Sequence, residues 1–146
     1  MFLGQYTHAL DDKGRLTIPS RFRDDLAGRS VVITRGLDRC LTVYPLAVWE
    51  EIAQKVNALS ITDPRGRALR RVFFADAMEA DLDRQGRILV PDRLREYAGL
   101  EPTAEAVIVG LDRFMEVWSP QRWEETNAHQ MELMDEDPAL WENLQI

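Results

Sequence analysis

The sequence has few of the residues on which metal sites, disulfides and membrane anchors depend. It contains one cysteine, Cys40, and two histidines, which excludes an internal disulfide and a zinc site built from clustered cysteine and histidine. No apolar run approaches the roughly 18 to 20 residues that a membrane-spanning helix needs. The first residues lack a basic stretch leading into an apolar one, so we expect no secretory signal and a cytoplasmic protein.

Motifs that carry catalysis are also missing. The sequence has no Ser-His-Asp grouping, no glycine-rich phosphate loop and no metal-ligand spacing. Cys40 lies in the apolar stretch CLTVY, where we expect it to pack as a small hydrophobe. These absences predict a protein that is not an enzyme and that uses no metal, cofactor or small-molecule substrate.

Positive charge is in the minority and unevenly placed. The 146 residues carry 18 Lys and Arg against 25 Asp and Glu, a net charge of −7. Residues 1–75 hold 12 basic and 8 acidic side chains, whereas residues 76–146 hold 6 and 17. Seven of the acids lie beyond residue 123, where there is no Lys or Arg. Because the local field attracts a polyanion, the basic half remains compatible with nucleic acid.

An internal repeat organises the chain. LDDKGRLTIP at residues 10–19 matches LDRQGRILVP at residues 82–91, with Leu, Asp, Gly, Arg and Pro in register. RGLDRCLTVYPLAVWEE at residues 35–51 matches VGLDRFMEVWSPQRWEE at residues 109–125. Two matching blocks in the same order indicate a tandem duplication of a unit of about 45 residues.

Both units have the same predicted layout: two short strands joined by a tight turn, a short helix, two more strands and a longer helix. The expected strands are 6–10, 15–18, 30–34 and 40–44 in the first unit, and 79–82, 87–90, 106–109 and 114–118 in the second. The expected helices are 20–26 (ending near Gly28), 46–58, one starting at Asp63-Pro64, 92–98 and one from about residue 120.

The repeat divides the chain into four parts. They are repeat 1 at 5–58, a helical connector at 59–76, repeat 2 at 77–125 and an acidic C-terminal segment at 126–146. Four short strands cannot close a core alone, so we expect the two units to form one pseudo-twofold domain. For the acidic segment, two alternatives stay open: an amphipathic helix that docks on a neighbour, or a loosely ordered tail.

The doubled Leu-Asp-x-x-Gly-Arg-x-x-x-Pro motif, followed each time by Gly-Leu-Asp-Arg and Trp-Glu-Glu, resembles the MraZ family of bacterial transcriptional regulators. The resemblance covers about residues 1–125 and places the chain in the AbrB/MazE-like class. It implies a mainly β (α+β) fold, a swapped-hairpin AbrB-like β-barrel made from two tandem ββαβ-type (SpoVT-AbrB-like) repeats in one chain, with flanking helices.

The same resemblance implies a function. The family regulates transcription as a ring-like homo-oligomer on short direct repeats of double-stranded DNA upstream of the cell-division and cell-wall operon. This chain would then be a sequence-specific DNA-binding protein, associated with the nucleoid in the cytoplasm. The alternative is an antitoxin-like or protein-interaction barrel module without DNA specificity of its own, and salt-sensitive retention of DNA would separate the two.

The resemblance also points to site residues, because the family's DNA contacts are associated with its Asp-x-x-x-Arg motif. Arg15 is the first candidate, since a planar guanidinium fits phosphate or guanine bidentately. The DNA-binding candidates are Arg15, Lys13, Arg21 and Arg87. The residues expected to shape the turns and orient the arginines are Asp11, Gly14, Asp83 and Gly86.

Structural explanations compete with DNA binding for several of these residues. For Arg87, pinning a hairpin and contacting DNA are equally well supported, and a solvated helix face is the simpler explanation of Arg21. Asp11 is better explained as a turn residue, because a carboxylate repels DNA. Arg67, Arg70 and Arg71 are spaced to form a basic helix face, which fits ion pairs between subunits as well as it fits DNA.

Overall fold

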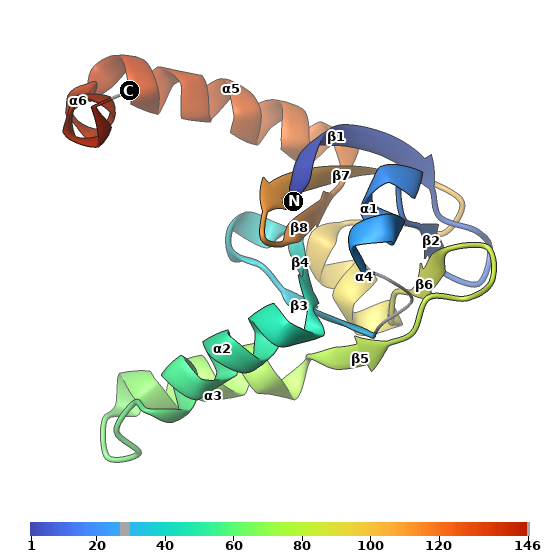
Figure 1. The fold of residues 1–146 in the computed structure, drawn as a ribbon, viewed down its shortest axis with the longest axis horizontal. Coiled ribbons are helices and arrows are strands. Elements are labelled where there is room, and N and C mark those ends of the chain that lie inside the picture. The colour runs from blue at the N-terminus through green and yellow to red at the C-terminus, as the bar shows by residue number, and fades with distance from the viewer. Residues whose placement is uncertain (27–29, 146) are drawn as a thin grey trace.

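The computed structural model describes residues 1–26 and 30–145, which form a mixed α and β fold (Figure 1). The strands are β1 (Phe2–Ala9), β2 (Arg15–Thr17), β3 (Val31–Arg35), β4 (Leu41–Pro45), β5 (Met78–Ala80), β6 (Arg87–Leu89), β7 (Glu105–Asp112) and β8 (Met115–Trp118). The helices are α1 (Ser20–Leu26), the 3-10 turn η1 (Leu37–Arg39), α2 (Leu46–Asn57), α3 (Pro64–Ala75), α4 (Asp92–Ala98), α5 (Pro120–Glu136) and α6 (Ala139–Leu144).

Strands from the two repeats pair with each other. The larger sheet has six strands in the order β1-β7-β8-β4-β3-β5, and every neighbouring pair is antiparallel. In it, β1 of the first repeat pairs with β7 of the second, and β4 pairs with β8. A smaller sheet consists of β2 and β6, one strand from each repeat. Neither repeat therefore completes its sheet without the other.

The antiparallel sheet and the flanking helices confirm the expected mixture of strands and helices. Within the described residues, the strands make two separate sheets, and β1 and β5 lie at the edges of the larger one. The closed swapped-hairpin barrel stays a prediction. Most predicted elements are confirmed with small shifts; β1 begins at Phe2 because its pairing with β7 extends to Asp112. The predicted helix end near Gly28 lies outside the described residues.

One hydrophobic cluster, made by both repeats, fills the space between the sheets and the short helices. Leu16 of β2 and Ile88 of β6 are fully buried, because alternation along each strand turns these side chains inward. Phe22 on α1 packs edge-to-face on Phe2 and Tyr6, with ring centroids 5.3 Å apart in both pairs. This packing holds α1 against β1, at the edge of the larger sheet.

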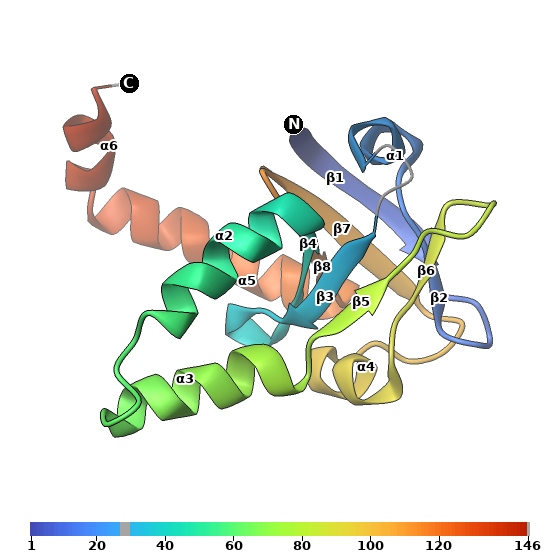
Figure 2. The same ribbon diagram turned by 60° about the horizontal axis from the view of Figure 1, so that its bottom comes forward.

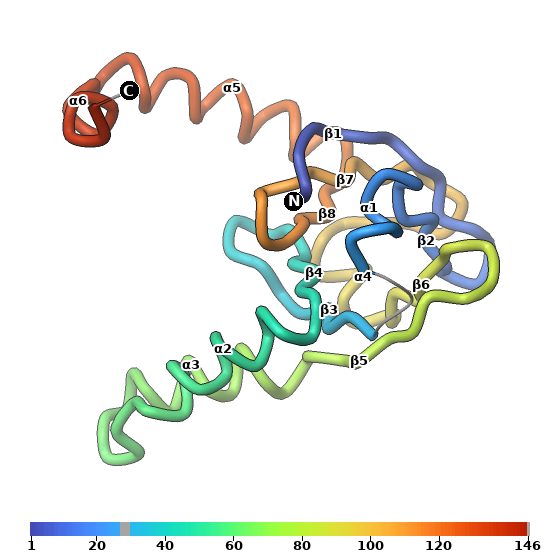
Figure 3. Tube along the Cα trace, in the orientation of Figure 1, coloured from blue at the N-terminus to red at the C-terminus, as the bar shows by residue number. Residues whose placement is uncertain are grey.

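Two helical arms leave the body at the end away from β2 and β6 (Figures 1 and 2). The first, the α2–α3 arm, is held by Trp49 and Phe73, whose rings stack with centroids 4.7 Å apart. The second, the C-terminal arm of α5 and α6, is anchored at its base by Trp123, which donates to Gln5 Oε1 at 2.8 Å. Figure 3 traces the two arms along separate paths. No described helix combines the length and the apolar character needed to cross a membrane.

Candidate nucleic-acid interface

The two Asp-x-x-Gly-Arg turns, residues 11–15 (turn 1) and 83–87 (turn 2), lie side by side at one end of the molecule (Figure 2). Pairing of β2 with β6 brings them together. The N–H of Ile18 donates to the carbonyl of Gly86, and the N–H of Val90 donates to the carbonyl of Gly14, both at 2.9 Å. Each repeat thus completes the hydrogen bonding of the other repeat's turn.

The aspartate of each turn holds both the backbone and the arginine. Asp11 Oδ1 accepts the N–H of Lys13 at 2.9 Å and the N–H of Arg15 at 2.8 Å, while its Oδ2 accepts Arg15 Nε at 2.6 Å. Asp83 accepts the N–H and the Nε of Arg87, each at 2.9 Å. A carboxylate at this position closes the turn and holds the guanidinium in one orientation.

Arg87 also links the two turns. In addition to Asp83, it reaches Asp11, with Nη1 3.5 Å from Oδ2. Asp11 is therefore paired with two arginines. The Arg15 side chain is 34% exposed and the Arg87 side chain 23%. Arg15 is thus the more accessible of the two motif arginines, with one carboxylate partner where Arg87 has two among the described residues.

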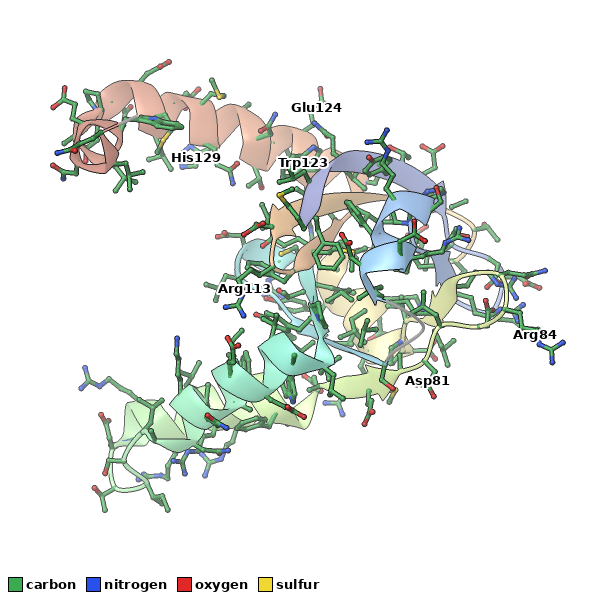
Figure 4. The ribbon with its side chains drawn as sticks, viewed as in Figure 1. Asp81, Arg84, Arg113, Trp123, Glu124 and His129 are labelled. Atoms are coloured by element: carbon green, nitrogen blue, oxygen red, sulfur yellow. The ribbon has the colours of Figure 1, made fainter. Side chains whose placement is uncertain are left out.

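The tips of the turns carry basic side chains in solvent. Lys13 is exposed in turn 1 and Arg84 in turn 2. Figure 4 shows Arg84 at the tip of its loop, pointing away from the body. Arg21 is exposed on α1, and the hydrogen bonds and ion pairs of the described residues do not tie it to either turn. Sequence reasoning did not select Arg84; its position directly after the second motif's aspartate is the signal that could have found it.

Two more arginines, Arg23 and Arg95, cross from the short helices to the opposite repeat's turn. Arg23 on α1 donates Nε to the carbonyl of Ile18 at 2.8 Å, and a Cβ on Gly86 would lie 2.3 Å from that Nε. Arg95 on α4 lies against Gly14 in the same way, 2.9 Å from the place of a Cβ. Both glycines have positive φ, +74° at Gly86 and +82° at Gly14. The structure therefore shows Arg23 and Arg95 as supports packed against the turns.

Gly86→Ala is expected to lower the free energy of unfolding by about 1–3 kcal/mol more than Gly4→Ala. Both positions have positive φ, so both variants bear the backbone cost. At Gly4, however, the nearest atom to a new Cβ is 3.6 Å away, which is ordinary contact, whereas at Gly86 the methyl would overlap Arg23. Urea unfolding measures the difference, and adding Arg23→Ala should recover part of it. Equal losses at the two glycines would contradict the close packing.

Hydrogen bonding lowers the pKa of both turn carboxyls. The N–H of Arg15, with further help from its guanidinium and the N–H of Lys13, lowers the pKa of Asp11 from 3.8 to about 2, against an opposing effect of desolvation. The N–H of Arg87 is the main cause of a lowered pKa at Asp83. Both turns therefore keep an ionised aspartate beneath their arginine at neutral pH.

Acid is expected to weaken turn 1. Because the folded-state pKa of Asp11 is depressed, its ionised form stabilises the fold above pH 3.8, and this contribution is lost as the pH falls toward 2. Asp11→Asn should lower the free energy of unfolding at neutral pH. The difference in this free energy between the variant and the parent protein should disappear by about pH 2. Urea unfolding of both proteins across this pH range measures the difference. A difference in the free energy of unfolding that does not change with pH would show that the charge of Asp11 is unimportant.

The remaining candidates for a reactive or metal-binding site are the Cys40 thiol, which is buried, and the His, Asp and Glu side chains, which are dispersed among the described residues. Cys40 is fully buried, and burial raises the pKa of its thiol, whose Sγ lies 3.0 Å from the carbonyl of Leu37. The expectation that it packs as a small hydrophobe is confirmed. Within residues 1–26 and 30–145, no three His, Cys, Asp or Glu side chains gather so as to hold a metal ion.

Comparison of the sequence with known proteins places the chain in a family. A family model described as "MraZ protein, putative antitoxin-like" matches the chain twice, at residues 1–72 and 73–142. Curated relatives named "Transcriptional regulator MraZ" include those of Thermomicrobium roseum (53% identical, covering 99% of this chain and 97% of the relative), Roseiflexus castenholzii (51%, 97% and 94%) and Moorella thermoacetica (51%, 99% and 96%). The double match and the full-length similarity agree with the repeat and the paired turns, and the chain belongs to the MraZ family.

Proposed function

We propose that this chain is a transcriptional regulator that binds double-stranded DNA sequence-specifically, as a ring-like homo-oligomer, on short direct repeats upstream of the cell-division and cell-wall operon. The observation that carries the proposal is the pair of adjacent turns, in which aspartates hold two arginines and basic side chains occupy the tips. The names of the relatives support the regulatory role. In this proposal the protein is not an enzyme and acts at the nucleoid in the cytoplasm.

The turns offer two kinds of contact to DNA. The Nε of Arg15 is occupied by Asp11, and that bond does not use the outer edge of the guanidinium, formed by its two Nη groups. This pre-oriented edge fits a phosphate or the edge of a guanine, and holding it in place reduces the entropy lost on binding. Lys13 and Arg84, exposed at the tips, suit contacts to phosphates.

The charge distribution favours DNA at this end despite the net charge of −7. Residues 11–15 and 83–87 carry four basic side chains and three acids. Arg23 adds one positive charge, whereas Arg95 is ion-paired with Asp92, so the local excess is two positive charges. Seven acids belong to the C-terminal arm, at the opposite end (Figure 1). A polyanion that approaches the turns is therefore attracted locally and kept away from the acidic arm.

Replacing Lys13 and Arg84 together with glutamine tests the proposal. The loss of two phosphate contacts should lower the slope of log K against log salt by about 2 and weaken operator and scrambled duplexes about equally. Anisotropy titrations of the chain's own upstream region at several salt concentrations provide the measurement. Lys55→Gln with Arg113→Gln is the control with the same change of charge: Lys55 lies in α2, and Figure 4 shows Arg113 away from the tip that carries Arg84. The proposal fails if the parent protein does not retain DNA, or if both pairs act alike.

The finer description of the fold belongs to the same proposal. It divides the chain into SpoVT-AbrB-like repeats at 5–58 and 77–125, a helical connector at 59–76 and an acidic segment at 126–146, with hairpins exchanged into a barrel. The two matches of the family model and the β2–β6 pairing between repeats support it. The alternative function, a protein-interaction module without DNA specificity, predicts no salt-sensitive retention of DNA in the same titrations.

A further inference from the structure

The outer face of α3 is apolar and open to solvent. Ala68, Leu69 and Val72 share this face at helical spacing, with Leu69 44% and Val72 49% exposed. Phe73, one turn after Leu69, lies at the edge of this face and stacks on Trp49 of α2, and Phe74 packs edge-to-face on the same Trp49 ring. An amphipathic helix normally turns its apolar stripe toward a packing partner. On α3 the edge of the stripe at Phe73 is covered by α2, whereas Leu69 and Val72 have no packing partner among the described residues.

Arginines border this open face and do not form the continuous basic face that the spacing of Arg67, Arg70 and Arg71 suggests. Arg67 donates to the carbonyl of Ile61 at 2.9 Å, and Arg70 reaches the carbonyl of Asn57 at 2.8 Å, so both hold the α2–α3 connection together. Arg71 remains exposed beside Ala68 and Val72, as does Arg65 one turn before Leu69. The α3 helix contains four arginines and no acid.

The C-terminal arm has the complementary character. From residue 124 onward there are seven acids and no Lys or Arg. The arm has no buried residue between Pro120 and Leu144. Its exposed large apolar side chains are Met131, Leu133, Leu140, Trp141 and Leu144. Figures 1 and 2 show this arm leaving the body apart from the α2–α3 arm, so the two surfaces do not meet within one chain.

We infer that the C-terminal arm of one copy docks on the outer face of α3 of a second copy. Contact between the two apolar faces removes both from water, while the arginines of α3 meet the acids of the arm and set the register. DNA is the poorer partner for α3, because it would place phosphates against Leu69 and Val72. Both arms lie at the end opposite turns 1 and 2, so docking leaves the turns free.

This inference deepens the proposed oligomer and rests on it. It assigns the acidic segment to assembly, which decides between the docking helix and the loose tail that the sequence leaves open. Each copy carries both an arm and an α3 face, so the arm of one copy can bind the α3 face of the next, and so on from copy to copy. Such a heterologous interface closes into a ring when the rotation between neighbouring copies permits it.

Cross-linking of the full-length protein tests the contact directly. A variant with both Val72→Cys and Leu140→Cys, treated with a short bismaleimide without DNA, should give dimers and higher species on a denaturing gel. Variants with either cysteine alone should give none, because each contact joins unlike positions, and Cys40 is too buried to react. An absence of cross-links from the double variant, or equal cross-linking from a single one, would overturn the inference.

Light scattering of full-length variants separates this inference from the proposed function. Leu69→Gln with Val72→Gln should lower the mass toward the 16.8 kDa of one chain, while Leu89→Gln, an exposed leucine at the opposite end, should leave the mass unchanged. Circular dichroism checks that both variants fold. If the parent is an oligomer and the α3 variant keeps its mass, only the docking inference fails. If the α3 variant keeps its mass but no longer binds DNA, the outer face of α3 is a DNA-binding surface and the docking inference is wrong. A monomeric parent would overturn the oligomer itself.

Discussion

Arg15→Ala is expected to lower the affinity of the assembled protein for its upstream DNA by about 10²-fold or more. One bidentate contact of an arginine with a base or phosphate is worth about 1–3 kcal/mol, and the loss recurs in every copy bound to the DNA. Arg15 is placed for such a contact because Asp11 holds its Nε while its side chain remains 34% exposed. Anisotropy titration at one salt concentration measures the loss.

Two related variants show whether the guanidinium itself matters. Arg15→Lys keeps the charge but has no planar fork, so it should recover little specific affinity while keeping the salt dependence. Arg87→Ala should have the smaller effect on DNA, since Arg87 is bound to both Asp83 and Asp11 and is 23% exposed. An Arg15→Ala protein that loses its oligomeric mass, or unfolds at lower urea, would instead assign Arg15 to the structure of the turn.

A probe with three direct repeats should bind about 10²- to 10⁴-fold more tightly than a probe with one. A single chain presents only a few basic side chains, and contacts of that number give dissociation constants of about 10⁻⁴ to 10⁻⁶ M at physiological salt. Copies joined in one assembly raise the effective concentration of each later contact. Gel-shift titrations with one, two and three repeats measure the gain, and equal binding to all three would contradict the role of the oligomer.

Changing the spacing of the repeats provides the matched control for this gain. Both turns lie at one end of each copy, so neighbouring copies in a ring reach the same side of the duplex only when repeats are separated by whole helical turns. Inserting about 5 base pairs between repeats should remove most of the gain without affecting the single-repeat probe. If the arms join the copies, the double substitution Leu69→Gln and Val72→Gln should likewise remove most of the gain on the three-repeat probe without affecting the single-repeat probe.

Local patterns predicted much of the fold and part of the site. The doubled motif indicated two turns, and each turn is closed by hydrogen bonds within five residues, from Asp11 to Arg15 and from Asp83 to Arg87. Interactions over so short a distance follow from residue type and spacing. The strands and helices were likewise predictable from the periodicity of apolar residues, because the same order of elements occurs in both repeats. The placement of Arg84 at a tip was available in principle from the same motif.

Contacts between distant residues were not available from these patterns. Whether Arg15 or Arg87 is the more accessible depends on the bond from Arg87 to Asp11, across the two turns. The packing of Arg23 against Gly86 of the other repeat depends on how strands of the two repeats pair. For Arg67 and Arg70, carbonyls in the α2–α3 connection compete for the side chains and remove them from the expected basic face.

By itself, the sequence determined that this protein is a duplicated unit with two aspartate-closed turns and an acidic end, because short-range hydrogen bonding and periodicity are properties of neighbouring residues. Only the tertiary structure decided that the turns share one end, which arginine is the more open, and that apolar arm surfaces remain exposed at the other end. Those outcomes depend on which distant groups exclude one another from water and share hydrogen bonds, and residue spacing does not specify them.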